Sequence, residues 1–209
     1  MKDNNEEYFY VKSIGDNYPM LDYLLGDYTE VDKSIALDTT KKRVVKFAPP
    51  IPSKPEFADL HYLTQHAPII SERLKDVLES FNLKEVQFLP AIIRDDRGND
   101  HDDFFIVHVY NEIKGLDKEK SDWEQSRYNK ERAKNIEKLV LDNEVLDQIP
   151  LEDRLVFALW EQSTNVFYHR SVVEKMLEIV PTGLTVYRLS GYSDKIPFIE
   201  NYMAKLQGE

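Results

Sequence analysis

The chain lacks cysteine, has few glycines and contains no long apolar segment, and each absence excludes a class of protein. Without cysteine there is no disulfide, thiolate nucleophile or thiolate metal site, which fits a reducing cytoplasm. Only seven glycines occur in 209 residues. None forms a phosphate-binding loop, a dinucleotide fingerprint or a Gly-x-Ser-x-Gly elbow. We therefore predict no cofactor, no catalytic residue and no enzymatic activity from the sequence motifs.

No stretch approaches the roughly 18 apolar residues that a membrane helix needs. The first seven residues are polar and acidic, without the basic and apolar regions of a signal peptide. We therefore expect a cytoplasmic protein with no membrane contact.

Negative charge is in excess, with 38 acidic against 27 basic residues and a formal net charge of −11. A field of this sign disfavours nucleic acid and anionic membranes, since phosphate contacts need lysine and arginine. It favours a partner with a basic surface, although many acidic proteins carry such a charge for solubility alone.

Two helix-then-strand units are the clearest local pattern. In the first, Ser71 caps a helix over 71–81, Asn82 suits a left-handed C-terminal position, and a strand follows over 86–93. In the second, Ser171-Val-Val-Glu174 has capping-box spacing before a helix over 171–179 and a strand over 184–189.

Most other segments are typical of strands or charged loops. We predict strands at 8–14, 43–47, 104–110, 138–142, 154–160 and 165–168. We also predict an irregular stretch over 17–25 that allows a helical turn at 20–25, a helix or ordered loop over 116–138, and a terminal helix over 197–207. Pro90, within strand 86–93, implies a bulge or an edge position.

These elements predict an α+β fold, a mostly antiparallel sheet with a few amphipathic helices packed on it. Four prolines lie in residues 49–55, and we interpret this stretch as a connection inside one domain of residues 1–209. Of all parts of that domain, residues 1–54 are the part whose assignment the sequence supports least.

An acidic loop over 94–103 is the first candidate binding site. It holds five carboxylates, those of Asp95, Asp96, Asp100, Asp102 and Asp103. No glycine sits in the turn position of an EF-hand and no glutamate closes the loop, so we predict no metal site, although His101 lies nearby. It is either a solvated hairpin tip or a contact surface for a basic partner.

Trp123 and Tyr128 are the second candidate, because they are embedded in the highly charged segment 116–138. Exposed aromatic residues beside charges suit an interface. Alternatively, they anchor this segment to the core.

The sequence also resembles a known family. The resemblance rests on helix 70–78 followed by Val86-Gln-Phe-Leu-Pro90, and on 104–110, Gly115-Leu-Asp117 with Ser121, 138–142, 166–168 and Pro181-Thr-Gly-Leu184. Over residues 55–190 the chain is similar to a bacterial immunity-protein family of polymorphic toxin systems, first catalogued as a domain of unknown function.

The resemblance implies a cytoplasmic antidote that binds a cognate secreted or contact-delivered toxin and occludes its active site. It transfers no catalytic residue, because the motifs are structural. Two alternatives stay open: an enzyme with an unrecognised carboxylate or metal site at 95–103, and a regulatory domain that binds another protein. The oligomeric state is not predicted.

Overall fold

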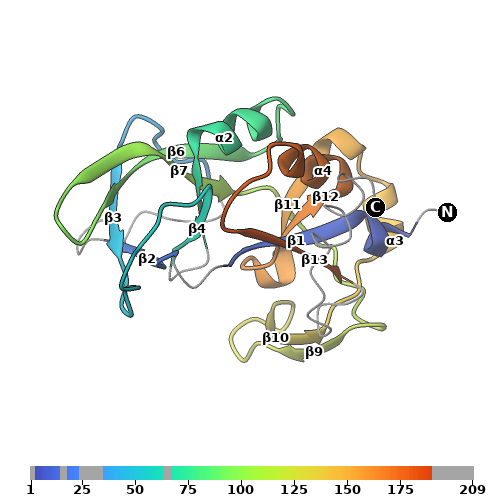
Figure 1. The fold of residues 1–209 in the computed structure, drawn as a ribbon. Helices are drawn as coiled ribbons and strands as arrows, with labels where there is room; N and C mark the ends of the chain where they lie inside the picture. The colour runs from blue at the N-terminus through green and yellow to red at the C-terminus, as the bar shows by residue number, and fades with distance from the viewer. Residues whose placement is uncertain (1–2, 15–17, 24–34, 64–66, 190–209) are drawn as a thin grey trace, which may run out of the picture. The chain divides into compact units, whose positions relative to one another are not determined.

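A computed structural model describes residues 3–14, 18–23, 35–63 and 67–189 (Figure 1). The chain falls into two compact units made of interleaved segments. The first unit comprises residues 1–11, 111–173 and 185–209, and the second comprises 12–110 and 174–184. The single domain expected over 1–209 stays a prediction. The predicted terminal helix at 197–207 lies outside the described residues.

The second unit contains a six-stranded sheet with the order β2-β3-β6-β7-β5-β4. Its strands are β2 Leu21–Tyr23, β3 Arg43–Phe47, β4 Leu60–Tyr62, β5 Pro68–Ser71, β6 Val86–Arg94 and β7 Asp100–Val109. The β3–β6 pair is parallel and the other pairs are antiparallel. An isolated parallel bridge from Leu21 to Leu63 joins the two ends of this order, so the sheet closes on itself.

Closure creates an interior lined by alternating residues of the strands, as expected for a small barrel. The buried cluster includes Leu21, Val45, Leu63, Ile69, Leu89, Ile93, Phe104 and Ile106. Helix α2, Glu72–Glu79, contacts β5 and β7 and buries Leu74 and Leu78. The cap prediction is confirmed, because Ser71 Oγ accepts a bond from Leu74 N, and Asn82 has the predicted positive φ of 49°.

The first unit contains a five-stranded sheet with the order β13-β1-β12-β11-β8. Its strands are β1 Tyr8–Ser13, β8 Glu112–Ile113, β11 Val156–Leu159, β12 Val166–His169 and β13 Leu184–Arg188. The β8–β11 pair is parallel, whereas β12 is antiparallel to β1 and β11. Tyr8, Phe157 and Phe167 centre its core, with the rings of Phe157 and Phe167 5.3 Å apart.

Short helices and a separate hairpin complete this unit. They are α1 Asn4–Glu7, α3 Asn143–Asp147, the 3-10 turns η2 Leu151–Asp153 and η3 Trp160–Gln162, and the hairpin of β9 Asp122–Gln125 with β10 Ala133–Lys138. Helix α4, Arg170–Glu178, follows β12 directly. The hairpin corrects the helix or loop predicted over 116–138. Residues 139–142 follow β10 instead of forming a strand at 138–142.

Three further predictions are corrected. Strand β2 occupies the place of the helical turn predicted near Met20. Ser171 is the second residue of α4 and not its cap; its N–H donates to Nδ1 of His169, 3.2 Å away. The path from His61 to Pro68 contains β4 and the start of β5, which the sequence pattern did not indicate.

Pro90 lies in a central strand and not at an edge. It is tolerated because the pairing of β6 with β3 begins at Ala91, so at Pro90 the strand pairs with β7 alone. The β6–β7 register shifts between Ala91 and Ile93, next to the proline. The fold class is therefore α+β with mixed sheets, mostly antiparallel, and few helices in the described residues.

Candidate functional site

The acidic loop of the sequence is the tip of the β6–β7 hairpin, and β7 extends into it as far as Asp100. Asp95 organises the turn: its carboxylate accepts hydrogen bonds from Arg97 N at 2.9 Å, Asn99 N at 2.8 Å and Asn99 Nδ2 at 2.9 Å. The Asn99 side-chain bond, with further help from the backbone and His101, holds the pKa of Asp95 well below its usual value. Asp95 therefore builds the loop and is not available to a partner.

Two other carboxylates of the loop form ion pairs within the unit. Arg94 binds Asp100 through Nε at 2.7 Å and Nη2 at 2.9 Å, and Lys42 Nζ lies 3.1 Å from Asp102. The side chains of Asp96 and Asp103 are exposed and make no hydrogen bond or ion pair within the part of the chain that the structure describes. The hairpin thus presents two free carboxylates, not five, together with the exposed cation of Arg97, which has no ion pair in the described structure.

An exposed aromatic ring lies against this hairpin. The side chain of Phe57 is 38% exposed, and its ring centroid is 4.2 Å from that of His101 and 5.7 Å from that of Phe104. Ile51, in the proline-rich connection before it, is 41% exposed. We name Phe57, Asp96, His101 and Asp103 the acidic surface. An apolar anchor with a charged rim is the composition of protein interfaces.

Sequence reasoning missed Phe57 and Ile51. The available signal was two large apolar residues in the loop over 49–57, where proline prevents both from entering a helix. Among the described residues, no group of three histidines and carboxylates is placed to hold a metal ion. His101 Nε2 lies 3.3 Å from Asp95 Oδ2, and the pair shares no third ligand there.

Trp123 and Tyr128 belong to the first unit, on the β9–β10 hairpin, and they differ in environment. Trp123 packs against the core together with Ile136, and its Nε1 donates to the Lys118 carbonyl at 3.2 Å. It anchors the hairpin. The Tyr128 side chain is fully exposed, at 101%.

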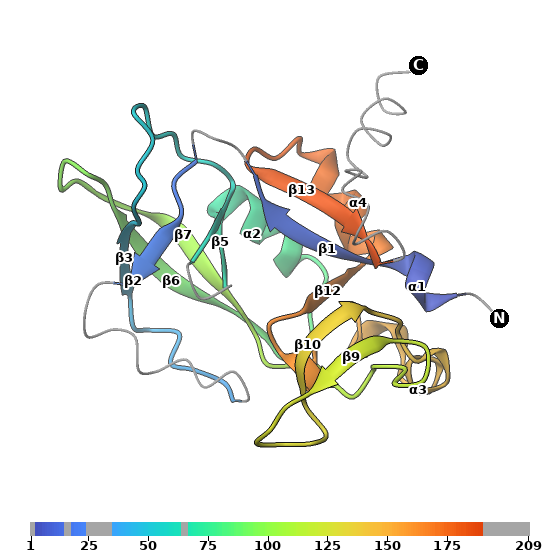
Figure 2. The same cartoon turned by 90° about the horizontal axis from the view of Figure 1, so that it is seen from below.

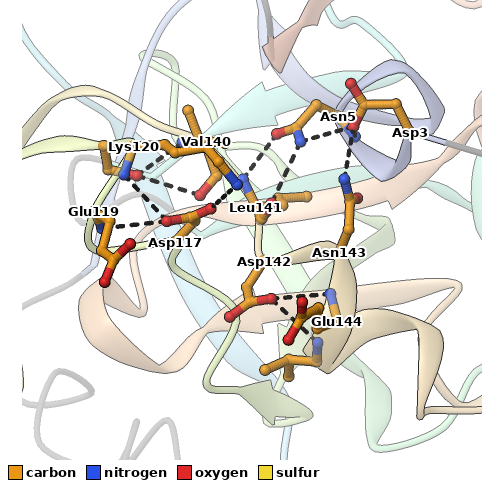
Figure 3. Close-up of polar contacts among 12 residues, drawn as sticks. Asp3, Asn5, Asp117, Glu119, Lys120, Val140, Leu141, Asp142, Asn143 and Glu144 are labelled. Carbon is orange, nitrogen blue, oxygen red and sulfur yellow. Dashed lines mark hydrogen bonds and ion pairs between the residues drawn. The ribbon is translucent and has the colours of Figure 1, made fainter.

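The family-like segments of the first unit bind each other (Figure 3). Asp117 N donates to Val140 O at 2.9 Å, Val140 N donates to Ser121 Oγ at 3.0 Å, and Asp142 N donates to Gly115 O at 2.8 Å. The Asp117 carboxylate accepts from Lys120 Nζ at 2.7 Å and from two backbone N–H groups. These motif residues are structural.

Asparagine side chains join α1 to the same region (Figure 3). Asn5 accepts from Leu141 N at 2.8 Å and donates to Leu141 O at 3.3 Å. Asp3 accepts from Asn5 and from Asn143 Nδ2 at 3.1 Å. All these groups are satisfied by the fold, so we exclude them as binding residues.

A second polar centre supports the Pro181-Thr-Gly-Leu184 motif within the second unit. The Asp59 carboxylate, 8% exposed, accepts from Arg73 Nε and Nη2 at 2.6 Å each and from Ser71 Oγ at 2.7 Å. It also accepts from Thr182 N at 2.7 Å and Thr182 Oγ1 at 2.9 Å. This carboxylate is saturated, so its role is to hold Ser71, Arg73 and Thr182 together.

Glu161 is the exception among the buried carboxylates of the described residues, since its Oε2 has no hydrogen-bond partner there. It is 3% exposed, and burial raises its pKa above the ordinary 4.5. Backbone hydrogen bonds, among them those of Leu116 and Gly115, and the charge of Lys118 partly offset this effect of burial on its pKa.

The comparisons with known proteins point to one family. A family model described as "Immunity protein family (Imm11)" matches residues 23–190, which extends further toward the N-terminus than the resemblance over 55–190. The search of curated proteins found no match. No helix in the described ranges is long and apolar enough to cross a membrane. The chain belongs to the Imm11 immunity protein family.

Proposed function

We propose that this protein neutralises a cognate bacterial toxin in the cytoplasm by binding it and occluding its active site. The observation that supports this most directly is the family match over 23–190. The protein acts by association and carries out no chemistry of its own. In the described residues, the carboxylates of Asp59 and Asp117 are saturated by internal hydrogen bonds, which supports a binding role over a catalytic one.

The acidic surface is the proposed contact. Phe57 provides a half-exposed ring for a pocket on the toxin, while Asp96 and Asp103 provide unpaired negative charge on the adjacent hairpin. The chain as a whole carries −11, which attracts a basic surface over long range. A toxin with a basic substrate groove, such as an enzyme that acts on nucleic acid, fits this surface.

The test uses the toxin domain encoded beside the immunity gene, in a form inactivated by mutation. Surface-immobilised toxin is titrated with the wild-type protein, with Phe57→Ala and with Asp96→Asn/Asp103→Asn. Phe57→Ala should raise Kd about 30-fold, because a central aromatic anchor contributes about 2 kcal/mol. The double variant should slow association several-fold at low salt and less at high salt, because rim charges act mainly on the on-rate.

Matched controls separate site effects from general ones. Leu151→Ala removes an apolar side chain that is 42% exposed in the first unit. Glu119→Gln/Glu152→Gln removes two exposed charges there. These controls should keep wild-type affinity. In parallel, cells expressing the active toxin should grow only with protein that binds. If the wild-type protein neither binds the toxin nor protects the cells, the proposed function is overturned. Equal binding by all variants would exclude only the acidic surface as the contact.

A further inference from the structure

The loop between β9 and β10 includes residues 126–131, a segment that differs in charge and composition from the rest of the chain. It reads Ser126-Arg-Tyr-Asn-Lys-Glu131, so it is basic and aromatic on a protein of net charge −11. Figure 2 shows it extending beyond the ends of both strands. Tyr128 at its tip is the most exposed large hydrophobic residue in the described part of the chain. A folded protein gains nothing internally from a tyrosine in this position.

The loop is nevertheless held in one shape by hydrogen bonds. Ser126 N donates to Arg132 O at 2.9 Å and Arg132 N donates to Asn129 O at 3.0 Å. Side chains close the turn further: Tyr128 N donates to Ser126 Oγ at 3.3 Å and Glu131 N donates to Asn129 Oδ1 at 2.9 Å. A loop fixed in this way loses little conformational entropy on binding.

The base of the loop is braced against η3. Arg132 donates to the Trp160 carbonyl and lies 3.4 Å from Glu112, and its guanidinium carbon is 4.2 Å from the centre of the Trp160 ring. Lys114 Nζ is 4.1 Å from the same ring centre and 3.6 Å from Glu131. These contacts hold the base of the loop against η3 and Glu112.

Two basic side chains of the loop have no ion pair within the described residues once the surrounding charges are paired. Three pairs neutralise the hairpin and its surroundings: Lys114 with Glu131, Arg132 with Glu112, and Lys134 with Glu124. Arg127 and Lys130, which flank Tyr128, are exposed and have no ion pair in the described structure. The tip therefore carries one exposed aromatic ring and two unpaired positive charges.

We propose that this loop is a second contact with the toxin and that it binds an acidic patch on the toxin surface. Tyr128 is the central anchor, and Arg127 and Lys130 pair with carboxylates around it. The inference rests on the proposed function, because the partner is the same toxin. Tyrosine, serine, asparagine and arginine are the residues of binding loops, since tyrosine gives a large contact area with few rotatable bonds.

The test measures association and dissociation of the inactivated toxin domain encoded by the neighbouring gene. Tyr128→Ala should raise the dissociation rate at least tenfold with an unchanged melting temperature, because the ring makes no internal packing contact. Arg127→Glu/Lys130→Glu should slow association at least tenfold at low salt. Lys138→Glu is the control, with the same type of charge change at the far end of β10, and should stay within about twofold of wild type.

A photocrosslinking amino acid at position 128 identifies the contacted surface. Crosslinks to toxin peptides rich in aspartate and glutamate support the proposal, and crosslinks to basic toxin peptides or to a second copy of this chain overturn it. If the wild-type protein binds and the loop variants behave like Lys138→Glu, the inference fails and the proposed function stands. If the wild-type protein does not bind the toxin, both fail.

Discussion

Replacing Asp59 with alanine should destabilise the second unit by about 2 kcal/mol. The substitution removes the acceptor for Arg73, Ser71 and Thr182 and breaks the tie between α2 and the Thr182 turn. Losing one partner of a buried ion pair costs about 3–5 kcal/mol. Arg73 is 53% exposed and recovers water once released, so we expect a loss of about 2 kcal/mol, which is below that range.

The stability lost on replacing Asp59 with alanine should depend on pH in a defined direction. Burial by itself raises the pKa of Asp59, but hydrogen bonds from Arg73, Thr182 and Ser71 outweigh it and hold the folded-state pKa well below 3.8. A depressed folded pKa adds stability above the unfolded-state pKa, and this stability is lost as pH falls below about 3.8. The wild-type protein should therefore exceed Asp59→Ala in stability at pH 7 and approach it in acid.

Thermal and urea unfolding at pH 7 and pH 3 measure this difference. A loss of about 2 kcal/mol corresponds to roughly 4–8 °C in melting temperature for a chain of this size. Asp103→Ala is the matched control, because this exposed carboxylate has no partner in the described structure and should change stability by less than about 0.5 kcal/mol. Equal stability of Asp59→Ala and Asp103→Ala at pH 7 would refute the structural role of Asp59.

Two further predictions concern backbone strain and a buried charge. Gly183 has φ +70°, and a Cβ there would lie 2.5 Å from Ala58 Cβ, whereas Gly98 has φ +84° and open space around it. Gly183→Ala should therefore lower the free energy of unfolding by about 2–4 kcal/mol, and Gly98→Ala by only about 1 kcal/mol. Urea unfolding measures both losses, and equal losses would refute the close contact. The raised folded pKa of Glu161 means that the contribution of this one side chain to stability is most favourable in acid and falls as pH rises above 4.5. Glu161→Gln should remove that decline and raise the melting temperature at pH 8, and an unchanged pH dependence of melting would contradict the raised pKa of this buried carboxylate.

Local signals in the sequence were sufficient to predict those elements whose conformation is determined by residues close in sequence. The Ser71 cap and the left-handed Asn82 follow from side-chain chemistry within one turn. The β6–β7 and β11–β12 hairpins follow from apolar, β-branched runs beside polar loops. The cap at Ser171 was predicted wrongly because β12 runs directly into α4, and His169 occupies the capping position that the serine pattern suggested.

The β9–β10 hairpin is an element that the local sequence does not predict. Strand β10 reads Ala-Lys-Asn-Ile-Glu-Lys, a composition with low strand propensity. Its one large apolar residue, Ile136, lies directly opposite Trp123 in the pairing, and both rest on the core of the first unit. A two-stranded hairpin is marginal alone, so tertiary packing decides this element. Closure of the six-stranded sheet through Leu21 and Leu63 is likewise a long-range event with no local sequence signal.

The candidate surfaces follow the same logic, because available charge is what remains after the fold has paired the rest. Composition showed five aspartates in the acidic loop, but Lys42, 60 residues away, neutralises Asp102, and neighbouring groups occupy Asp95 and Asp100. In the basic loop, pairing likewise leaves only Arg127 and Lys130 unpaired in the described structure. Net charge therefore predicts the sign of a distant attraction, whereas the residual unpaired groups define the contact. Substituting a paired charge should mainly alter stability, and substituting an unpaired one should mainly alter association with the toxin.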